Sequence, residues 1–502
     1  MQFTLGKVKR GIFEAVPLII AGLLLPLSFS PFHLSGFAFL SLAWLIVRLD
    51  KKINPFTSGF IFGLAFFGFG ISWIYNSIHQ FGHLPPLIAF MVTSLFVAYL
   101  AIYPAITSWL YLKLKQPFAS PLFYSALFAT LWTMSEWLRG HLFTGFPWLQ
   151  VGFGQIDSPL GKLIPIIGVY GTTFLVVFIG GLVASLFTYK GLKRMGVQIF
   201  LVIFLLGLHQ WQPKPWTTLI DKPMSVGVVQ ANLSMRDKWD ESYFWRLISH
   251  YQKAIYQLLG KDLIILPESA IPVPAEMIAE EMNAFDSVTK KFGSALLVGI
   301  PQEDEQTEQQ RYYNSLTVLG QGEGIYRKQQ LVPFGEYLPK PFQFLNHWAP
   351  LASANMLPGD NKQSLPLAKR RPFATLICYE LAYDHLLRKQ LPDAQWLVSI
   401  SDDGWFGYSL APFQQQQMAQ VRSLQTGRYQ IMANNDGLSA VIDSIGTISA
   451  SLPAFTSGIL SNQIFPATGM TPWSNWGNWP ILILCLLIIF YSITKKAIDI
   501  LK

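Results

Sequence analysis

The sequence predicts a bundle of about eight membrane-spanning α-helices joined to an α/β domain that lies outside the bilayer. Charged residues make up only 13% of the 502-residue chain and hydrophobic residues 51%, with a mean hydropathy of +0.34. A soluble protein usually carries roughly 25% charged residues. Apolar segments fill the first two hundred residues, and from Ser225 short β-rich runs alternate with helical ones. The first pattern is typical of a membrane bundle and the second of a layered α/β domain.

Eight apolar segments are candidates for membrane spans, seven in the first part of the chain and one near its end. They lie at about Phe13–Phe29, Leu34–Val47, Gly59–Ile78, Leu87–Leu112, Pro121–Leu138, Leu163–Phe187, Met195–Leu208 and Trp479–Ile493. The second segment is short, since a spanning helix needs about 20 apolar residues. We therefore expect a seven-span bundle in residues 1–215, an outer domain in residues 216–470, and a last span with its tail in residues 471–502.

Basic residues cluster in every second loop of the predicted bundle. The clusters are Lys7, Lys9 and Arg10; Arg48, Lys51 and Lys52; Lys113 and Lys115; Lys190, Lys193 and Arg194; and Lys495, Lys496 and Lys502. Cytoplasmic loops carry an excess of Lys and Arg, so we expect these loops and both chain ends on the cytoplasmic side. Two clusters on one side require an even number of crossings between them, so the short second segment must span. The domain after the seventh segment then lies outside the cytoplasm.

Composition also excludes several function classes. The formal net charge of +8 comes without a long basic run, so we expect no nucleic-acid partner. Only two cysteines are present, Cys378 and Cys485, which excludes a disulfide framework and a Cys-rich zinc site. The eight histidines lack the His-Glu-x-x-His spacing of zinc proteases, and we expect neither a metal nor a cofactor. Ionisable residues are scarce inside the spans, which argues against a transporter with an outer domain.

The outer region alternates between predicted strands and helices. The strands are expected at Ser225–Val229, Leu263–Leu266, Ala295–Ile300, Ser315–Leu319, Phe373–Ile377, Trp396–Ile400, Gln430–Ala433 and Ala440–Asp443. The helices are expected at Glu241–Leu259, Ala275–Lys291 and Pro412–Gln425. This alternation predicts an α/β layered domain of about 240 residues.

Three strand-like runs in this domain end on reactive or ionisable residues. Phe373–Ile377 ends at Cys378, and another run ends at Glu268 after a proline that stops the ladder. A third run ends on Arg327 and Lys328, which point to opposite faces, so one of them faces inward. A buried strand that delivers a thiol to its tip is typical of a nucleophile. The alternative is a buried structural cysteine, which is common.

The order Glu268, Lys328, Cys378 resembles the catalytic triad of the nitrilase superfamily. Together with the sequences at Leu331–Tyr337 and Asp403–Gly407, it resembles the apolipoprotein N-acyltransferase family. The resemblance implies two sheets back to back, each covered by helices, as an αββα sandwich. It also implies that Lys328 is the inward residue. The other residues to which it assigns a place are Glu336, which supports the lysine, Tyr379 and Glu380 beside the substrate, and Trp239 and Asn314 near the site. For Trp239, ordinary packing is an equal alternative.

The resemblance implies a two-step acyl transfer in a bacterial inner membrane, with the catalytic domain on the periplasmic side. A phospholipid would donate its acyl chain to Cys378, and a diacylated apolipoprotein would accept it on the α-amino group of its N-terminal cysteine. We expect a monomer. The main alternative is a membrane-anchored carbon–nitrogen hydrolase (an amidase), which would not need a seven-span bundle.

Two hydrophobic segments are further candidates for lipid contact. The loop Glu136–Trp148 carries Arg139 and several aromatic residues. It is either an interfacial aromatic belt or a substrate-binding wall, for which Arg139 and Trp148 are the candidates. The segment Phe334–Gly359 is long and apolar for a loop. We expect it to be a lid that admits acyl chains, and the alternative is a cover packed over the domain.

Overall fold

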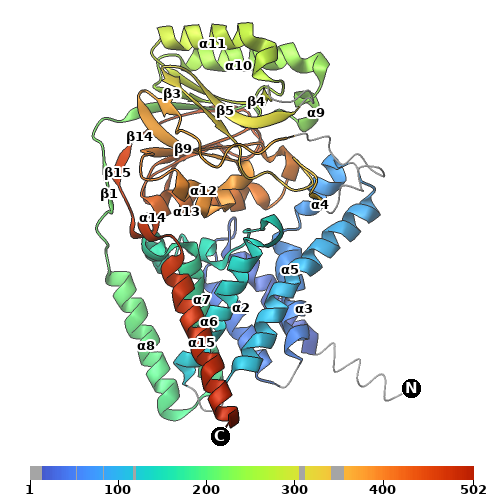
Figure 1. Ribbon diagram of the computed structural model, residues 1–502, viewed down its shortest axis with the longest axis vertical. Helices are drawn as coiled ribbons and strands as arrows, with labels where there is room; N and C mark the ends of the chain where they lie inside the picture. The colour runs from blue at the N-terminus through green and yellow to red at the C-terminus, as the bar shows by residue number, and fades with distance from the viewer. Residues whose placement is uncertain are drawn as a thin grey trace. The chain divides into compact units, whose positions relative to one another are not determined.

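The computed structural model in Figure 1 describes residues 14–51, 54–82, 84–116, 120–304, 311–340 and 356–501. Its internal contacts divide the chain into two compact units. Unit 1 comprises Met1–His79, His83–Lys214 and Trp476–Lys502, and unit 2 comprises Gln80–Gly82 and Pro215–Asn475. Unit 1 is helical, whereas the strands and the remaining helices belong to unit 2.

Helices occupy every apolar segment that the sequence indicates in unit 1. Their bounds are Glu14–Ser28 with its last turn η1 (Leu25–Ser28), α2 (Gly36–Leu49), α3 (Pro55–Gly70), α4 (Ile74–Asn76), η2 (Ser77–Phe81), α5 (Pro86–Leu114), α6 (Pro121–Arg139), η3 (Leu142–Thr144), η4 (Val151–Gln155), η5 (Pro159–Leu163), α7 (Ile164–Thr188), α8 (Gly191–Gln210) and α15 (Trp479–Leu501). The predicted helical character of this part is therefore confirmed.

Four helices among the described residues are long and apolar enough to cross a membrane. They are Pro86–Leu114, Pro159–Thr188, Gly191–Gln210 and Trp479–Asp499. The helices Pro55–Gly70 and Ile74–Gln80 meet the same criteria together but are bent by 65°, which makes the number four or five. Helix α2 has 14 residues, which is about 21 Å at 1.5 Å per residue. The chain is thus a membrane protein with four or five clear spans, fewer than the eight predicted from sequence.

Small residues bring α3 and α5 into close contact. A Cβ atom added at Gly63 would lie 2.8 Å from the Ala101 Cα, and one added at Gly59 would lie 2.3 Å from the Pro104 carbonyl oxygen. Apolar helices gain little from hydrophobic burial against one another in lipid, so close backbone packing becomes important. The two glycines, one helical turn apart, provide that close approach.

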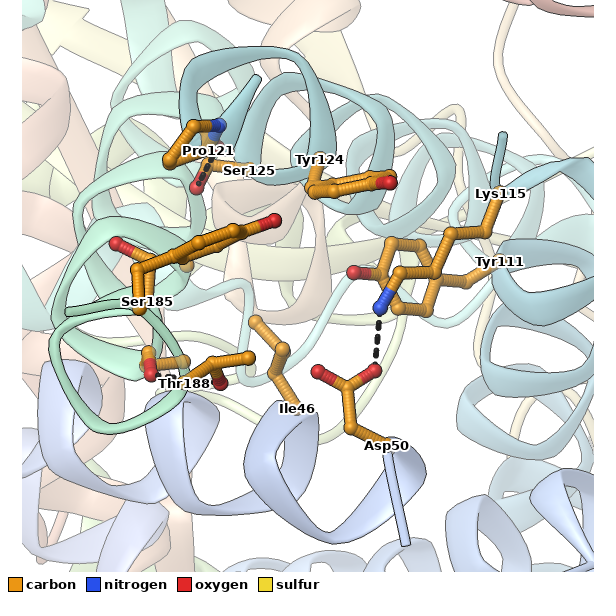
Figure 2. Close-up of a pocket in the computed structure, with 12 residues that line it drawn as sticks. Ile46, Asp50, Tyr111, Lys115, Pro121, Tyr124, Ser125, Ser185 and Thr188 are labelled. Carbon is orange, nitrogen blue, oxygen red and sulfur yellow. Dashed lines mark hydrogen bonds and ion pairs between the residues drawn. The ribbon is translucent and has the colours of Figure 1, made fainter. Parts of the chain in front are cut away.

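A small polar cavity lies where the ends of α2, α5, α6 and α7 meet (Figure 2). The Lys115 ammonium pairs with the Asp50 carboxylate, and it also lies 4.7 Å from the centre of the Tyr124 ring. The cavity volume is about 20 Å³, room for about one water molecule. It is therefore too small for a lipid headgroup, and the ion pair links the ends of α2 and α5.

Unit 2 contains two large sheets in its described part, with strand orders β14-β2-β3-β4-β5-β7 and β13-β12-β11-β10-β9-β8-β6, and a small sheet β1-β15. The strands are β1 (Thr217–Leu219), β2 (Met224–Gln230), β3 (Leu263–Ile265), β4 (Ala295–Glu303), β5 (Tyr312–Gly320), β6 (Gly322–Glu323), β7 (Ile325–Arg327), β8 (Leu367–Ala368), β9 (Arg371–Ile377), β10 (Trp396–Ser401), β11 (Gln430–Asn434), β12 (Ala440–Ile442), β13 (Ile448–Ser451), β14 (Gly458–Ile464) and β15 (Ala467–Gly469). Strands β2, β3 and β4 are parallel, as are β9, β10 and β11. The eight predicted strands are all present.

Unit 2 also contains long and short helices in its described part. They are α9 (Met235–Lys238), η6 (Glu241–Tyr243), α10 (Phe244–Leu258), η7 (Ala275–Ile278), α11 (Ala279–Lys291), η9 (Cys378–Ala382), α12 (Asp384–Lys389), η10 (Asp403–Phe406), α13 (Ala411–Thr426) and α14 (Pro472–Trp476). Helices α10 and α11 lie on one side of the sheets, and α12 and α13 lie on the other (Figure 1).

Alternate residues of the central strands fill two separate hydrophobic cores. Leu263 and Ile265 of β3 pack between the sheets, against residues such as Phe373 of the second sheet. Ile264, which points the other way, packs with Leu247 of α10. A strand buried on both faces requires a continuous apolar run, which explains the sequence pattern. The result is the α-β-β-α layer order that the resemblance implied.

The close contact between α3 and α5 predicts a sharp difference between two glycine substitutions. Gly63→Leu forces the backbones of α3 and α5 apart and should lower stability by about 1–3 kcal/mol or more. Gly207→Leu, on α8, is the matched control because no atom lies within 4 Å of an added Cβ there. Thermal unfolding of the two variants in detergent tests this, and equal loss of stability would contradict the packing argument.

Candidate active site

The three residues of the predicted triad come together in unit 2. Lys328 directly follows β7, and Cys378 directly follows β9. Glu268 follows β3, and its Oε1 accepts a hydrogen bond of 3.3 Å from the Lys328 Nζ. Cys378 lies close enough for the charges of both residues to affect its thiol. Residues far apart in the sequence thus meet because strand ends meet at one edge of the sandwich.

Cys378 lies at a sharp turn between β9 and the short helix η9. Its φ angle is +52°, a region that non-glycine residues rarely adopt. Backbone strain of this kind persists only where the surrounding structure holds it, and it is frequent at active sites. The turn carries the thiol away from the line of the strand, while the side chain stays buried.

The Glu380 carboxylate stabilises this turn through hydrogen bonds. Its carboxylate accepts hydrogen bonds from the backbone N–H groups of Ile377 (2.8 Å), Gln329 (2.7 Å) and Gln330 (3.1 Å) and from the Tyr326 hydroxyl. Burial raises the pKa of Glu380 to about 7, although the backbone donors lower it. Glu380 therefore ties the loop after Lys328 to the turn that carries the cysteine.

Lys328 is the inward residue of its pair. Its ammonium donates to the Oε1 atoms of Glu336 at 2.9 Å and of Glu268 at 3.3 Å, and its side chain is 1% exposed. Burial alone would lower the pKa of Lys328, but the two carboxylates raise it above its ordinary value, so the ammonium stays charged. The guanidinium of Arg327 instead lies 4.2 Å from the centre of the Tyr313 ring.

Asn314 and Glu336 complete the hydrogen bonds around the lysine. The Asn314 side-chain amide donates to Glu268 Oε1 at 2.7 Å and to Glu336 Oε1 at 2.9 Å. The other oxygen of Glu336 accepts from the Val332 backbone N–H at 2.8 Å. One amide and one ammonium therefore hold two carboxylates together. Tyr379 is half-buried beside the cysteine, and its ring contacts that of Tyr383.

The thiol of Cys378 is protonated in this resting arrangement. Burial raises the pKa of Cys378 well above its ordinary value, and the negative charge of Glu268 raises it further. The positive charge of Lys328 lowers this pKa, and so does a hydrogen bond with Ser401, but neither outweighs the burial. A base must therefore remove the proton when the sulfur reacts.

Two further buried charges that the sequence did not indicate lie beside Glu268. Lys238 and Asp402 form a buried ion pair. The Lys238 ammonium also donates to the Glu268 backbone carbonyl at 3.0 Å, and the Asp402 backbone N–H donates to Glu268 Oε2 at 3.1 Å. The only signal in the sequence is their position, because Lys238 precedes Trp239 and Asp402 precedes the Asp403–Gly407 segment.

The remaining predicted site residues differ in their surroundings. Trp239 is 49% exposed. Arg139 and Trp148 belong to unit 1 and are buried. The Arg139 guanidinium donates to the backbone carbonyl oxygens of Phe146 (2.7 Å) and Trp148 (2.5 Å), which fixes the loop. Arg139 thus stabilises the conformation of its own loop. Substrate contact by Arg139 or Trp148 stays a prediction.

Two other expectations concern ligands and the lid. No group of three or more His, Cys, Asp or Glu side chains among the described residues could hold a metal ion. Most of the predicted lid, residues 341–355, lies outside the described residues. In its first part, Phe334 is exposed and has a φ angle of +64°.

Comparisons with known proteins cover nearly the whole chain. The family described as apolipoprotein N-acyltransferase N-terminal domain matches residues 21–182, and the carbon–nitrogen hydrolase family matches residues 225–469. An apolipoprotein N-acyltransferase of Coxiella burnetii is 36% identical over 492 residues, which cover 96% of this chain and 99% of the relative. That of Haemophilus influenzae is 38% identical over 501 residues (96% and 94%), and that of Pseudomonas syringae is 34% identical over 490 residues (96% of each). This full-length similarity shows that the chain belongs to the apolipoprotein N-acyltransferase family of the nitrilase superfamily.

Proposed function

We propose that this N-acyltransferase works through a thioester on Cys378, with Glu268 as general base and Lys328 as oxyanion stabiliser. The donor is a membrane phospholipid, and the acceptor is the α-amino group of the N-terminal diacylglyceryl-cysteine of an apolipoprotein. The observation that supports the proposal is the meeting of Glu268, Lys328 and Cys378 in one buried cluster. It contains a sulfur atom that can act as nucleophile, a carboxylate and a charged ammonium, which are the parts that acyl transfer requires.

In the first step Glu268 accepts the Cys378 proton as the sulfur attacks the ester carbonyl of the phospholipid. The carbon–sulfur bond forms, and the negative charge on the carbonyl oxygen is stabilised by the Lys328 ammonium and the Tyr379 backbone N–H. The ester carbon–oxygen bond then breaks, and Glu268 returns the proton to the leaving oxygen of the lysophospholipid. Because the resting thiol is protonated, proton transfer and attack are coupled in this step.

In the second step the acceptor amine attacks the thioester. Glu268 takes a proton from the amine, the amide bond forms, and the sulfur leaves as a thiolate that regains the proton from Glu268. Glu336 holds the lysine and Asn314 holds the base throughout, since Glu336 accepts a hydrogen bond from the Lys328 ammonium and the Asn314 amide donates one to Glu268. In the amidase alternative, water would take the place of the amine.

We propose that the chain crosses the membrane about eight times. Residues 1–215 and 471–502 contain these spans, and residues 216–470 form the catalytic domain. The two short apolar helices, Glu14–Ser28 and Gly36–Leu49, and helix α6 (Pro121–Arg139) complete the set. The basic clusters favour cytoplasmic chain ends and a periplasmic catalytic domain in a bacterial inner membrane. We also propose that the enzyme is a monomer and that the exposed Trp239 contacts the lipid substrate.

Cys378 should carry a fatty acyl group when the enzyme is supplied with phospholipid alone. An N-acyltransferase must keep water from its thioester until the amine arrives, so the adduct should persist. It should discharge on addition of a diacylglyceryl-cysteine peptide, but not when the amine of that peptide is acetylated. Mass spectrometry of the intact enzyme measures the adduct. Cys378→Ala should remove it, and Cys485→Ala, which changes the other buried cysteine, should not. Rapid hydrolysis without any amine would favour the amidase.

Glu268→Gln and Lys328→Met should both abolish acylation but should change thiol reactivity in opposite directions. Glu268 raises the pKa of Cys378 and Lys328 lowers it. Removing the carboxylate should therefore increase the thiolate fraction at a given pH, and removing the ammonium should decrease it. The measurement is the rate of Cys378 alkylation by iodoacetamide between pH 7 and pH 10 in a Cys485→Ala background. Lys369→Met is the control. Shifts in the same direction would contradict these electrostatic roles.

The proposed orientation predicts where a reporter enzyme is active. A reporter that works only outside the cytoplasm should be active when fused after Trp216 and silent when fused after Lys115. This result is expected because loops rich in Lys and Arg stay on the cytoplasmic side. The reverse pattern would place the candidate active site in the cytoplasm and would contradict the orientation.

A further inference from the structure

The buried ion pair between Lys238 and Asp402 lies outside the proposed triad. Their side chains are only 1% and 3% exposed. Removing two charges from water costs much free energy, and hydrophobic residues of similar volume often stabilise a fold as well or better. The pair is therefore not explained by stability alone, and its other contacts indicate its role.

Both partners of the ion pair contact Glu268. The Lys238 Nζ donates to the Glu268 backbone carbonyl at 3.0 Å, and the Asp402 backbone N–H donates to Glu268 Oε2 at 3.1 Å. Lys328 and Asn314 bind the other oxygen, Oε1. The backbone carbonyl, Oε2 and Oε1 of Glu268 are thus held by different donors, two of them on Oε1.

The backbone at Pro267 and Glu268 also packs tightly against the neighbouring strand β4. A Cβ atom added at Gly299 of β4 would lie 2.1 Å from the Pro267 carbonyl oxygen and 2.8 Å from the Glu268 Cα. Ser269, the next residue, has a φ angle of +44°. Asp402 is itself fixed, because its Oδ1 accepts hydrogen bonds from the Gly404 N–H and the Asn435 side-chain amide, both at 3.2 Å.

Lys238 is the last residue of α9, and the exposed Trp239 follows it directly. The lysine side chain points inward to Asp402 and Glu268, while a large aromatic side chain one position later is half exposed. The short helix therefore ends on a lysine whose side chain reaches the Glu268 backbone.

We propose that the Lys238–Asp402 ion pair positions Glu268 for proton transfer. The inference rests on the proposed role of Glu268 as general base. Lys238 and Asp402 act as positioning residues, since each reaches the reacting atoms only through Glu268. Without Lys238, the Glu268 backbone loses its buried donor, and the carboxylate shifts relative to the Cys378 sulfur. A displacement of about 1 Å in such a group can cost about a hundredfold in rate.

The test compares Lys238→Met, Asp402→Asn and the double variant in the full-length enzyme. Each single variant leaves one buried charge unpaired and should lower the melting temperature. The double variant removes both charges and retains the backbone N–H at position 402 that donates to Glu268 Oε2, so the melting temperature should recover. The rate of Cys378 acylation at saturating phospholipid should remain about ten- to a hundredfold below that of the unmodified enzyme, with KM for the donor unchanged. Recovery of the rate together with the melting temperature would overturn the proposal.

A second measurement links the effect to Glu268. Glu268→Gln should cost less in the Lys238→Met/Asp402→Asn background than in the unmodified enzyme, because residues that act through one another are not additive. An equal cost in both backgrounds would show that the pair acts elsewhere and would overturn the proposal. A fully active Glu268→Gln enzyme would instead contradict the proposed function itself.

A more exposed ion pair in the same unit supplies the matched control. Lys369 and Asp262 lie 3.3 Å apart, with side chains 32% and 34% exposed. The variant Lys369→Met/Asp262→Asn makes the same two substitutions away from Glu268. It should leave the acylation rate unchanged, and a loss equal to that of the Lys238→Met/Asp402→Asn variant would also overturn the proposal.

Discussion

The arrangement of the candidate active site depends on one buried ammonium between two carboxylates. The Lys328 Nζ donates to both Glu268 and Glu336, and the Asn314 amide joins the same two oxygens. A lone charge in such a place would cost several kcal/mol, so the strand ends that carry these residues must stay together. The neighbouring thiol of Cys378 stays protonated mainly because it is buried, and the charge of Glu268 adds to this effect. The same ammonium thus fixes the geometry of the two carboxylates and lowers the pKa of the thiol beside them.

Much of the fold was predictable because its determinants are local. The strands buried on both faces appear as continuous apolar runs, and the amphipathic stripe of α10 appears in its spacing. Strand β14 (Gly458–Ile464) was not predicted, since it is partly exposed and contains Ser461, Asn462 and Gln463. The number of spans is harder to predict, because the 14 residues of α2 are few for a span whereas the charge pattern predicts that this helix crosses.

The candidate site was predictable only in part. Cys378, Glu268 and Lys328 each follow a strand-like run, and the ends of these strands meet at one edge of the sandwich although β7 lies in an antiparallel ladder. The Lys238–Asp402 contact joins residues 164 positions apart, and no local pattern determines which buried charges pair. The sequence of the Glu136–Trp148 loop, an arginine among aromatic residues, is compatible both with lipid contact by the arginine and with hydrogen bonds from the arginine to its own backbone. The structure shows that Arg139 binds the carbonyl oxygens of its loop.

The protonated state of Cys378 has a consequence for the lifetime of the enzyme. Oxidants and disulfides react with thiolates much faster than with thiols. In the oxidising compartment to which the proposed orientation assigns the catalytic domain, an exposed low-pKa cysteine would be lost to sulfenic acid or mixed disulfides. Burial and the charge of Glu268 keep the sulfur in its unreactive form between turnovers. The other cysteine, Cys485, lies buried in the helix α15 of unit 1. The proposed nucleophile can therefore stay chemically intact where few free thiols persist.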